Sequence, residues 1–427
     1  MLSFLIFLGS LFLFLIINIP IPFCLALASL LLMFVSGLDL HFSLIVQRLY
    51  EGVDSFPLMA IPLFILTGNL MKRGGMSRRI VEVANALFGW LRGSLSFITI
   101  ASCMFFAGMS GSAVADASAI GGIVLPIMEE KGYGKQFSGS LLATAGTIGP
   151  IIPPSLPMVI YGVTSGTSIA ALFMGGVIPG LIIGLGLMVV AGYYSIKLGY
   201  VSKVPFSIKK AIIALKESFL TLGAPIIIVG GIFGGIFTPT ESATVAAVYS
   251  FVIGFFIYKD LKIKDFPRIM INTAISSAIV MFIVSTSNFS AWVIAVKQIP
   301  LIVSDMFTYF SSTPIIVLIV INIFLLFWGM IMDLTPSIMI LVPIFLPLLN
   351  ELNIDLSYFG VIMVVNLCIG LVTPPVGTVL YVVSGMTGLK PLVLAKGAIP
   401  FLLVMVLVLL LMIIFPPIVT WLPSLVN

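Results

Sequence analysis

The sequence contains very little charge, histidine or cysteine. Only 8% of its 427 residues are charged, 60% are hydrophobic, and His41 is the single histidine. A water-soluble protein of this length needs a charged surface, so the composition excludes a soluble domain. Cys24, Cys103 and Cys368 stand singly in apolar stretches, without metal-ligand spacing. A zinc site and a histidine-based catalytic triad are therefore not expected.

Long apolar stretches recur to the end of the chain, which is typical of a multi-pass membrane protein. The first stretch lacks the basic start and small-residue cleavage site of a signal peptide, so we interpret it as a retained helix. Stretches 94–130 and 313–350 are interrupted near the middle by small and polar residues, which predicts two re-entrant helical hairpins. The predicted spans are 2–17, 22–37, 56–71, 137–165, 169–197, 212–237, 241–258, 268–290, 357–387 and 393–417.

The basic residues lie in short loops between these stretches, which explains the net charge of +5 without a nucleic-acid partner. If the loop 72–79 is cytoplasmic, 18 of the 20 lysines and arginines face the cytoplasm, and only Arg48 and Lys297 face outward. Such an excess of basic residues in cytoplasmic loops is the pattern of inner membrane proteins. The same threading predicts that both termini are periplasmic.

A shift of 221 residues brings one half of the sequence onto the other without a gap. The motif F-x-G-M at 106–109 recurs at 327–330, and I-G-x-x-x-P-P at 148–154 recurs at 369–375. Between 106 and 179, 15 of 74 positions are identical, and glycines and prolines, which set backbone shape, coincide in one register. The first hairpin is predicted to open to the cytoplasm and the second to the outside. Inverted repeats with broken helices are typical of secondary transporters, whose sites lie near the midplane.

Four segments place polar backbone inside apolar surroundings: 108–113, 145–154, 329–336 and 369–375. A helix that breaks inside a bilayer leaves carbonyl and amide groups that must be satisfied. Freed carbonyls and hydroxyls can bind a hard cation such as sodium, and freed amides suit an anion. Each hairpin tip facing a broken helix therefore predicts one sodium site. The first site would use Ser110, Ser112, Gly149, Ile152 and Pro154, and the second would use Asp333, Thr335, Gly370 and Thr373.

Asp333 is the sharpest single candidate, because a carboxylate inside a membrane is costly and usually functional. Its alternative role is a cap for the helix that begins ahead of Pro336. Asp116 has no acid at the matching position of the second half, so a structural role or a contact at a domain boundary is expected for it. The polar cluster 285–288 is expected at the membrane edge, with substrate contact as the alternative. Candidate substrate contacts are Ser112, Thr147, Asp333, Pro154 and Pro375.

Four motifs carry a family resemblance: F-A-G-M-S-G-S at 106–112, G-P-I-I-P-P at 149–154, F-T-P-T-E at 237–241 and V-T-P-P-V-G at 372–377. They resemble the large membrane subunit of TRAP transporters (tripartite ATP-independent periplasmic transporters), over nearly the whole chain. The resemblance implies a sodium-driven importer of an organic acid anion that works by an elevator movement, with two or more sodium ions and no other cofactor. It implies a small four-helix membrane subunit (Q type) and a periplasmic substrate-binding protein (P type) as partners. The sialic-acid members are closest in appearance, followed by the C4-dicarboxylate members.

The combined prediction is an all-α integral membrane protein with an inverted-repeat, elevator-type ion-transporter fold. Scaffold helices and an arm are predicted for 1–92 and 201–310, and a transport core with one hairpin and one broken helix for 93–200 and 311–427. The alternatives are a stand-alone anion–sodium symporter, a membrane-embedded enzyme and a channel. An enzyme is disfavoured because the sequence offers no cluster of reactive side chains in its apolar stretches. The glycine-rich segment 230–241 lacks the Gly-Lys-Ser/Thr ending of a phosphate-binding loop, so no ATP-driven mechanism is expected.

Overall fold

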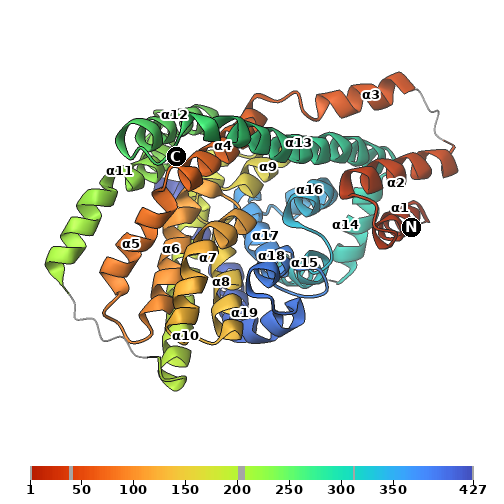
Figure 1. Cartoon of the computed structure of the whole chain (residues 1–427). Coiled ribbons are helices and arrows are strands. Elements are labelled where there is room, and N and C mark those ends of the chain that lie inside the picture. The colour runs from red at the N-terminus through yellow and green to blue at the C-terminus, as the bar shows by residue number, and fades with distance from the viewer. Residues whose placement is uncertain (1, 38–41, 201–206, 311–312, 426–427) are drawn as a thin grey trace.

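The computed structural model describes residues 2–37, 42–200, 207–310 and 313–425 (Figure 1). Within these ranges every regular element is a helix, which confirms the all-α prediction. His41 lies outside the described residues. The helices of the first half are α1 (Leu2–Ile16), α2 (Ile21–Val35), α3 (Phe42–Glu51), η1 (Phe56–Met59), α4 (Ala60–Arg73), α5 (Met76–Phe88), α6 (Ser94–Ser110), α7 (Ala113–Glu130), α8 (Lys135–Gly146), α9 (Leu156–Ser165) and α10 (Ile169–Lys197).

The second half continues with the same kinds of element. Its helices are α11 (Ile208–Phe233), α12 (Pro239–Val252), the π-helical η2 (Ile253–Ile257), η3 (Ile263–Asp265), α13 (Phe266–Val296), α14 (Ile299–Phe310), α15 (Pro314–Gly329), α16 (Leu334–Glu351), α17 (Leu356–Gly370), α18 (Thr378–Thr387), α19 (Pro391–Ile414), α20 (Pro417–Thr420) and η4 (Pro423–Leu425).

Helix boundaries in the two halves correspond to one another under the same 221-residue shift. The shift takes both ends of α7 onto both ends of α16, and the start of α8 onto the start of α17. It also takes α1 and α2 onto parts of α11 and α12. The exception is α13, a single helix of 31 residues that corresponds to α3 and α4 together. In the first half that pair is bent by 60° at the break between residues 51 and 56.

Two helical hairpins and two broken helices are present where the sequence predicts them. The first hairpin, α6–α7, turns at Gly111, whose φ of +61° favours glycine, and Ser112 caps α7 by accepting a hydrogen bond from the backbone of Ala115. The second hairpin, α15–α16, turns over residues 330–333. The predicted spans 137–165 and 357–387 are each two helices, α8 with α9 and α17 with α18. The peptide bonds Pro153–Pro154 and Pro374–Pro375 are both cis, at positions that the shift brings together.

The helix lengths are those of a multi-pass membrane protein. Among the described residues, six helical segments are long and apolar enough to cross a membrane, and a seventh is added if the bent pair of α3 and α4 counts as one span. The polar cluster 285–288, expected at the end of a span, lies within α13, which continues to Val296. The Ser285 hydroxyl donates to the Leu49 carbonyl of α3 (2.7 Å), so at least this member of the cluster joins helices.

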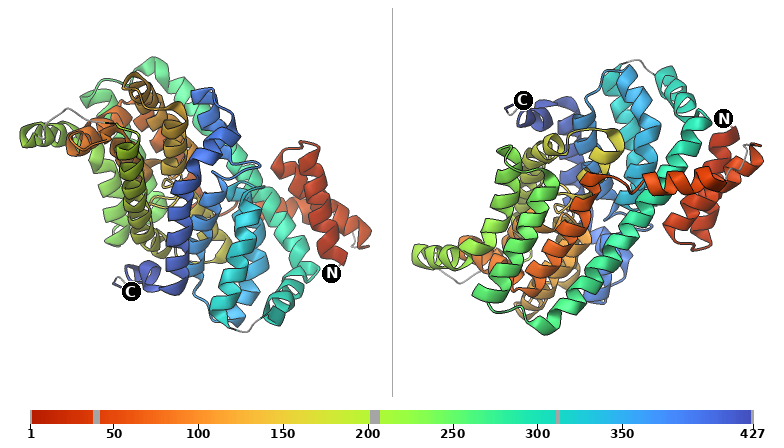
Figure 2. Two further views of the ribbon diagram at one scale, coloured as in Figure 1. Left: turned by 90° about the horizontal axis from the view of Figure 1, so that it is seen from below. Right: turned by 90° about the horizontal axis from the view of Figure 1, so that it is seen from above.

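The two halves interlock. α13 runs along one side of the molecule and packs against α4 in the first half and α16 in the second (Figures 1 and 2). The second part of each broken helix packs on the hairpin of the other half, α9 on α16 and α18 on α7. The Tyr161 hydroxyl of α9 also donates to the Leu356 carbonyl at the start of α17 (2.8 Å). Each hairpin is therefore held between broken helices from both copies of the repeat.

Candidate functional site

The tip of the first hairpin packs its backbone directly against the break between α8 and α9. The Leu156 N–H donates to the Gly111 carbonyl (3.4 Å), and a Cβ atom on Gly111 would lie only 2.7 Å from the Pro154 carbonyl oxygen. The Ser155 hydroxyl donates to the Pro150 carbonyl, which closes the turn before α9. Backbone carbonyls of the break and the hairpin tip are thus brought together in a buried position, as a cation site requires.

Asp116 lies in this junction, which the sequence did not predict. Its carboxylate is fully buried; one oxygen, Oδ1, accepts a hydrogen bond from the Ser110 hydroxyl. The other oxygen, Oδ2, has no hydrogen-bond partner among the described residues and would lie 2.4 Å from a Cβ atom on Gly149. The structure therefore places Ser110 and Gly149, two predicted ligands of the first sodium site, on either side of this carboxylate.

Of the other predicted members of the first site, Ser112 and Pro154 lie at the same junction, and the Ile152 side chain packs elsewhere. Ser112 caps α7 and remains half-buried, and the Pro154 carbonyl faces Gly111. The Ile152 side chain packs on Gly180 of α10. Ser110, Ser112, Gly149 and Pro154 thus surround one junction, whereas the structure gives the Ile152 side chain only a packing contact.

The second junction has a different arrangement. Asp333 occupies the N-cap position of α16, but its side chain makes no capping hydrogen bond. Instead, the Thr378 hydroxyl of α18 donates to Asp333 Oδ1 (3.4 Å), which connects the hairpin tip to the broken helix. The Val376 N–H donates to the Met330 carbonyl (3.1 Å) across the same junction. The sequence missed Thr378, although it lies five residues after the predicted ligand Thr373.

The remaining predicted ligands of the second site lie on both sides of this junction. A Cβ atom on Gly370 would lie 2.4 Å from the Gly329 carbonyl oxygen, so only a glycine permits this close approach. The Thr373 hydroxyl donates to the Ile369 carbonyl (2.7 Å), which leaves the oxygen lone pairs free to accept. Thr335 is half-buried in the first turn of α16.

Carboxylate and hydroxyl exchange places between the two hairpins. The 221-residue shift sets Ser112 against Asp333, and Asp116 against Ser337. Ser337 is fully buried, and its hydroxyl donates to the Asp333 carbonyl (2.7 Å) and accepts from the Trp328 indole N–H (3.1 Å). At these two matched positions each hairpin therefore carries one carboxylate and one hydroxyl, four residues apart and in opposite order. The sequence contains this signal, because the same shift that reveals the repeat shows the exchange.

A cavity of about 310 Å³ lies beside the first hairpin tip, between that hairpin and the helices α4 and α13. Ser112 is the one predicted substrate contact that lines it. We name the cavity beside the first hairpin tip the tip cavity, and its polar lining residues are Asn69, Lys72, Ser110, Ser112, Ser118 and Ser276. Thr147, another predicted substrate contact, does not line it. Thr147 is fully buried and donates to the Thr144 carbonyl (2.7 Å), so its side chain is directed into the protein.

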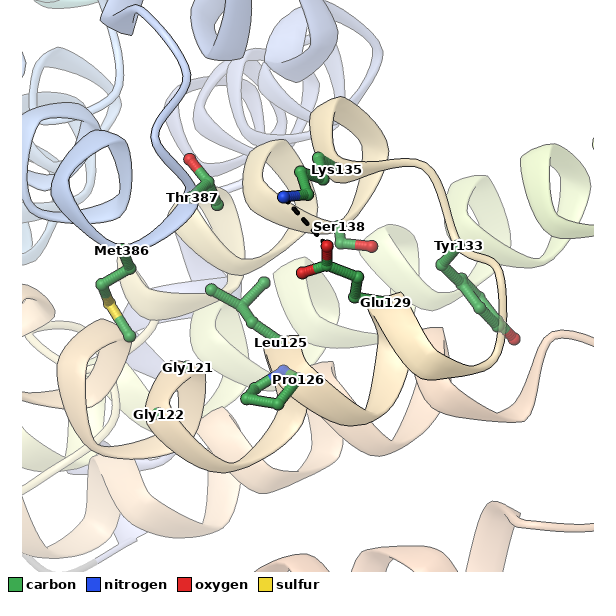
Figure 3. Close-up of a pocket in the computed structure, with 10 residues that line it drawn as sticks. All are labelled: Gly121, Gly122, Leu125, Pro126, Glu129, Tyr133, Lys135, Ser138, Met386 and Thr387. Carbon is green, nitrogen blue, oxygen red and sulfur yellow. Dashed lines mark ion pairs between the residues drawn. The ribbon is translucent and has the colours of Figure 1, made fainter.

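A second cavity, of about 340 Å³, lies further along the first hairpin between α7, α8 and the end of α18 (Figure 3). Lys135 and Glu129 form an ion pair there (2.9 Å), and Met386 and Thr387 enter from α18 (Figure 3). Burial raises the pKa of Tyr133 in the α7–α8 loop to about 12, so its phenol is neutral at physiological pH. This cavity contains none of the predicted ligands.

The fold and these junctions define a class of protein: a multi-pass helical membrane transport protein built from a duplicated unit. A sequence model of the tripartite ATP-independent periplasmic transporter family, DctM component, matches residues 8–418. The chain therefore belongs to this family, the TRAP transporter large permeases, and the resemblance seen in its motifs is confirmed.

Relatives of this chain carry different substrate names. The sialic acid TRAP transporter large permease protein SiaM of Vibrio cholerae is 39% identical, over 96% of this chain and 95% of its own length. The 2,3-diketo-L-gulonate TRAP transporter large permease protein YiaN of Escherichia coli is 38% identical, over 97% of both chains. The C4-dicarboxylate TRAP transporter large permease protein DctM of Pseudomonas aeruginosa is 37% identical, over 88% of both chains. Because these three sequence identities are nearly equal, they do not indicate which of the three substrates this chain transports.

Proposed function

We propose that this chain is the subunit that moves an organic acid anion across the bacterial inner membrane, driven by sodium. The substrates named for the three relatives are all organic acids that are anions at neutral pH, which supports an organic anion as the common feature. Sialic acid is the first candidate and a C4-dicarboxylate the second. The observation that carries the sodium coupling is the pair of junctions, each with one carboxylate among backbone and hydroxyl oxygens.

The proposed first sodium site consists of Ser110, Ser112, Gly149 and Pro154, with Asp116 added as its charged ligand. The proposed second site consists of Asp333, Thr335, Gly370 and Thr373. A carboxylate with several neutral oxygens is a donor set suited to a hard monovalent cation. Two sites agree with two or more sodium ions in each cycle. The substrate would bind beside the first site, in the tip cavity.

An elevator movement is proposed for the transport step. The hairpins and broken helices of 93–200 and 311–427 would form the moving core, and the helices of 1–92 and 201–310 the scaffold. Helices α5 and α14 precede the two hairpins in the chain and are suited to act as connecting arms. The charge distribution supports inverted, re-entrant hairpins and two periplasmic termini.

The family description as a tripartite transporter supports two partners. These would be a small four-helix membrane subunit (Q type) and a periplasmic binding protein (P type) that delivers the anion. Much of the substrate specificity would then lie in the binding protein rather than in this chain.

Uptake by purified proteins in liposomes tests the proposal. The chain is reconstituted with its small subunit and binding protein, and uptake of sialic acid and of succinate is measured with and without an inward sodium gradient. We expect uptake of one acid only with the gradient and both partners present. Uptake by the chain alone would favour the stand-alone symporter, and flux that needs no sodium would favour a channel.

A further inference from the structure

We propose that a pocket between the last turn of α4 and the first turns of α13 binds the carboxylate of the transported anion on its way to the cytoplasm. This proposal rests on the proposed function and adds a second, inner binding site to it. We name this pocket the cationic pocket. It has a volume of about 260 Å³ and is lined by Asn69, Lys72, Arg73, Arg268, Ile269 and Asn272.

The cationic pocket brings three basic side chains together. None of its three basic side chains, Lys72, Arg73 and Arg268, has a described carboxylate within 4.0 Å. Arg79 of α5, by contrast, is paired with Asp260 (2.7 Å). A small anion is therefore the ligand that this pocket fits.

The lining also contains two neutral amide donors, Asn69 and Asn272. The Asn69 amide donates to the Thr273 hydroxyl (3.0 Å), which ties α4 to α13 at the pocket. Asn272 lies on α13 one turn after Arg268, so their side chains share a face of the helix. Two amides beside three cations suit a carboxylate, which accepts several hydrogen bonds on its two oxygens.

The cationic pocket adjoins the tip cavity, because Asn69 and Lys72 line both. The Lys72 ammonium donates to the Ser118 hydroxyl of α7 (3.4 Å), so this lysine stands between α4 and the first hairpin. An anion that leaves Ser112 at the hairpin tip reaches Lys72 first and then Arg73 and Arg268. This order of increasing positive charge lowers the cost of moving the anion out of its buried site.

The phosphate of an anionic lipid could use the same cations. The continuity with the tip cavity favours the transported anion, because a lipid headgroup needs no passage to the hairpin tip. The experiments below separate these two sources.

Cysteine labelling tests the pocket without relying on transport. Cys24, Cys103 and Cys368 are buried, so an introduced Asn272→Cys offers one accessible thiol. Its rates of reaction with a sulfonate-bearing and an ammonium-bearing methanethiosulfonate reagent are compared in the purified complex. In the Arg73→Gln/Arg268→Gln background we expect the ratio of anionic to cationic rate to fall about tenfold, because the local potential is lost. The ratio should stay unchanged in Lys131→Gln/Lys396→Gln, which removes two exposed charges that lie on neither α4 nor α13. Equal ratios in all backgrounds would overturn the proposal.

Transport assays then identify the ligand. Vesicles are loaded with graded concentrations of the transported acid, and exchange for labelled acid outside is measured. We expect Arg73→Gln/Arg268→Gln to raise the half-saturating internal concentration about fivefold, as expected for the loss of charge-assisted contacts, with the external value unchanged. An unchanged internal value would overturn the proposal.

A change seen with phosphatidylglycerol but not in pure phosphatidylcholine would assign the pocket to lipid. Absence of all sodium-driven uptake by the unmodified complex would contradict the proposed function instead, and the labelling result would still decide whether the pocket attracts anions.

Discussion

The Ser110 hydroxyl donates a hydrogen bond to one carboxylate oxygen of Asp116, and the other oxygen of that carboxylate faces Gly149 without a hydrogen-bond partner among the described residues. A buried carboxylate oxygen left without a partner is costly. A bound cation removes that cost, because it supplies the missing charge and contact. The relationship between these residues therefore leads to the first two predictions.

Asp116→Asn should weaken sodium binding without unfolding the protein. The asparagine oxygen can still accept the hydrogen bond from Ser110, but the negative charge is gone. We expect the half-saturating sodium concentration for uptake to rise about tenfold, as for the loss of a charge-assisted contact. Sodium-dependent uptake in proteoliposomes measures it. Glu129→Gln, which changes an exposed acid on the same helix, is the control, and an equal sodium dependence in both variants would contradict the assignment of Asp116.

Gly149→Ala should abolish uptake, because its Cβ atom would lie 2.4 Å from Asp116 Oδ2 and would displace the carboxylate. Overpacking of this kind costs about 1–3 kcal/mol of stability, which the protein should tolerate. Gly122→Ala on α7 is the matched control, since nothing lies within 4 Å of its added methyl group. Uptake rates and elution on size exclusion are measured together. If both variants transport normally, the junction at Gly149 has no role in coupling.

Asp333→Ala should abolish sodium-coupled uptake and leave the folded complex intact. Its side chain makes no capping hydrogen bond to α16, so its removal costs the helix little. Uptake and complex assembly are assayed side by side, with Asp54→Ala, an exposed acid, as the control. Normal sodium dependence in Asp333→Ala would rule out this residue as an ion ligand.

Arg79→Ala should lower the thermal stability of the detergent-solubilised protein. The guanidinium pairs with Asp260 (2.7 Å) and lies 3.6 Å from the centre of the Tyr258 ring, and its own side chain is 16% exposed. Together these contacts are worth about 1–2 kcal/mol, so the melting temperature should drop by a few degrees. The neighbouring Arg78→Ala breaks only an exposed pair with Glu82 and should change little. Equal melting temperatures for the two variants would show that the Arg79 cluster does not hold α5 in place.

The hairpins and broken helices could be predicted because their signals are backbone signals. Glycine at the tips and paired prolines in the breaks restrict the chain locally, and they recur at one shift. Helix α3 was not among the predicted spans, because its sequence is less apolar than that of a span. Its Gln47, Arg48 and Glu51 form a hydrogen-bonded polar face, which keeps the segment below the hydropathy of a span.

The composition of the candidate site was harder to predict, because it depends on where side chains point. Thr147 lies in a break, which suggested substrate contact, yet its hydroxyl bonds back to Thr144 inside the protein. Asp116 was expected to be structural because its matching residue is not acidic. The 221-residue shift matches Ser112 with Asp333 and Asp116 with Ser337, but only the fold shows that the Asp116 carboxylate faces Gly149.

The exchange of carboxylate and hydroxyl between the hairpins has an electrical consequence. Four residues of helix separate Ser112 from Asp116, about 6 Å along the axis. With the hairpins inverted as proposed, the Asp333 charge lies at its tip while the Asp116 charge lies about one helical turn from its own tip, toward the cytoplasm. The two sodium ions would then bind at different depths in the transmembrane field and sense different fractions of the membrane potential. Voltage should therefore change the apparent affinity of one sodium ion more than that of the other.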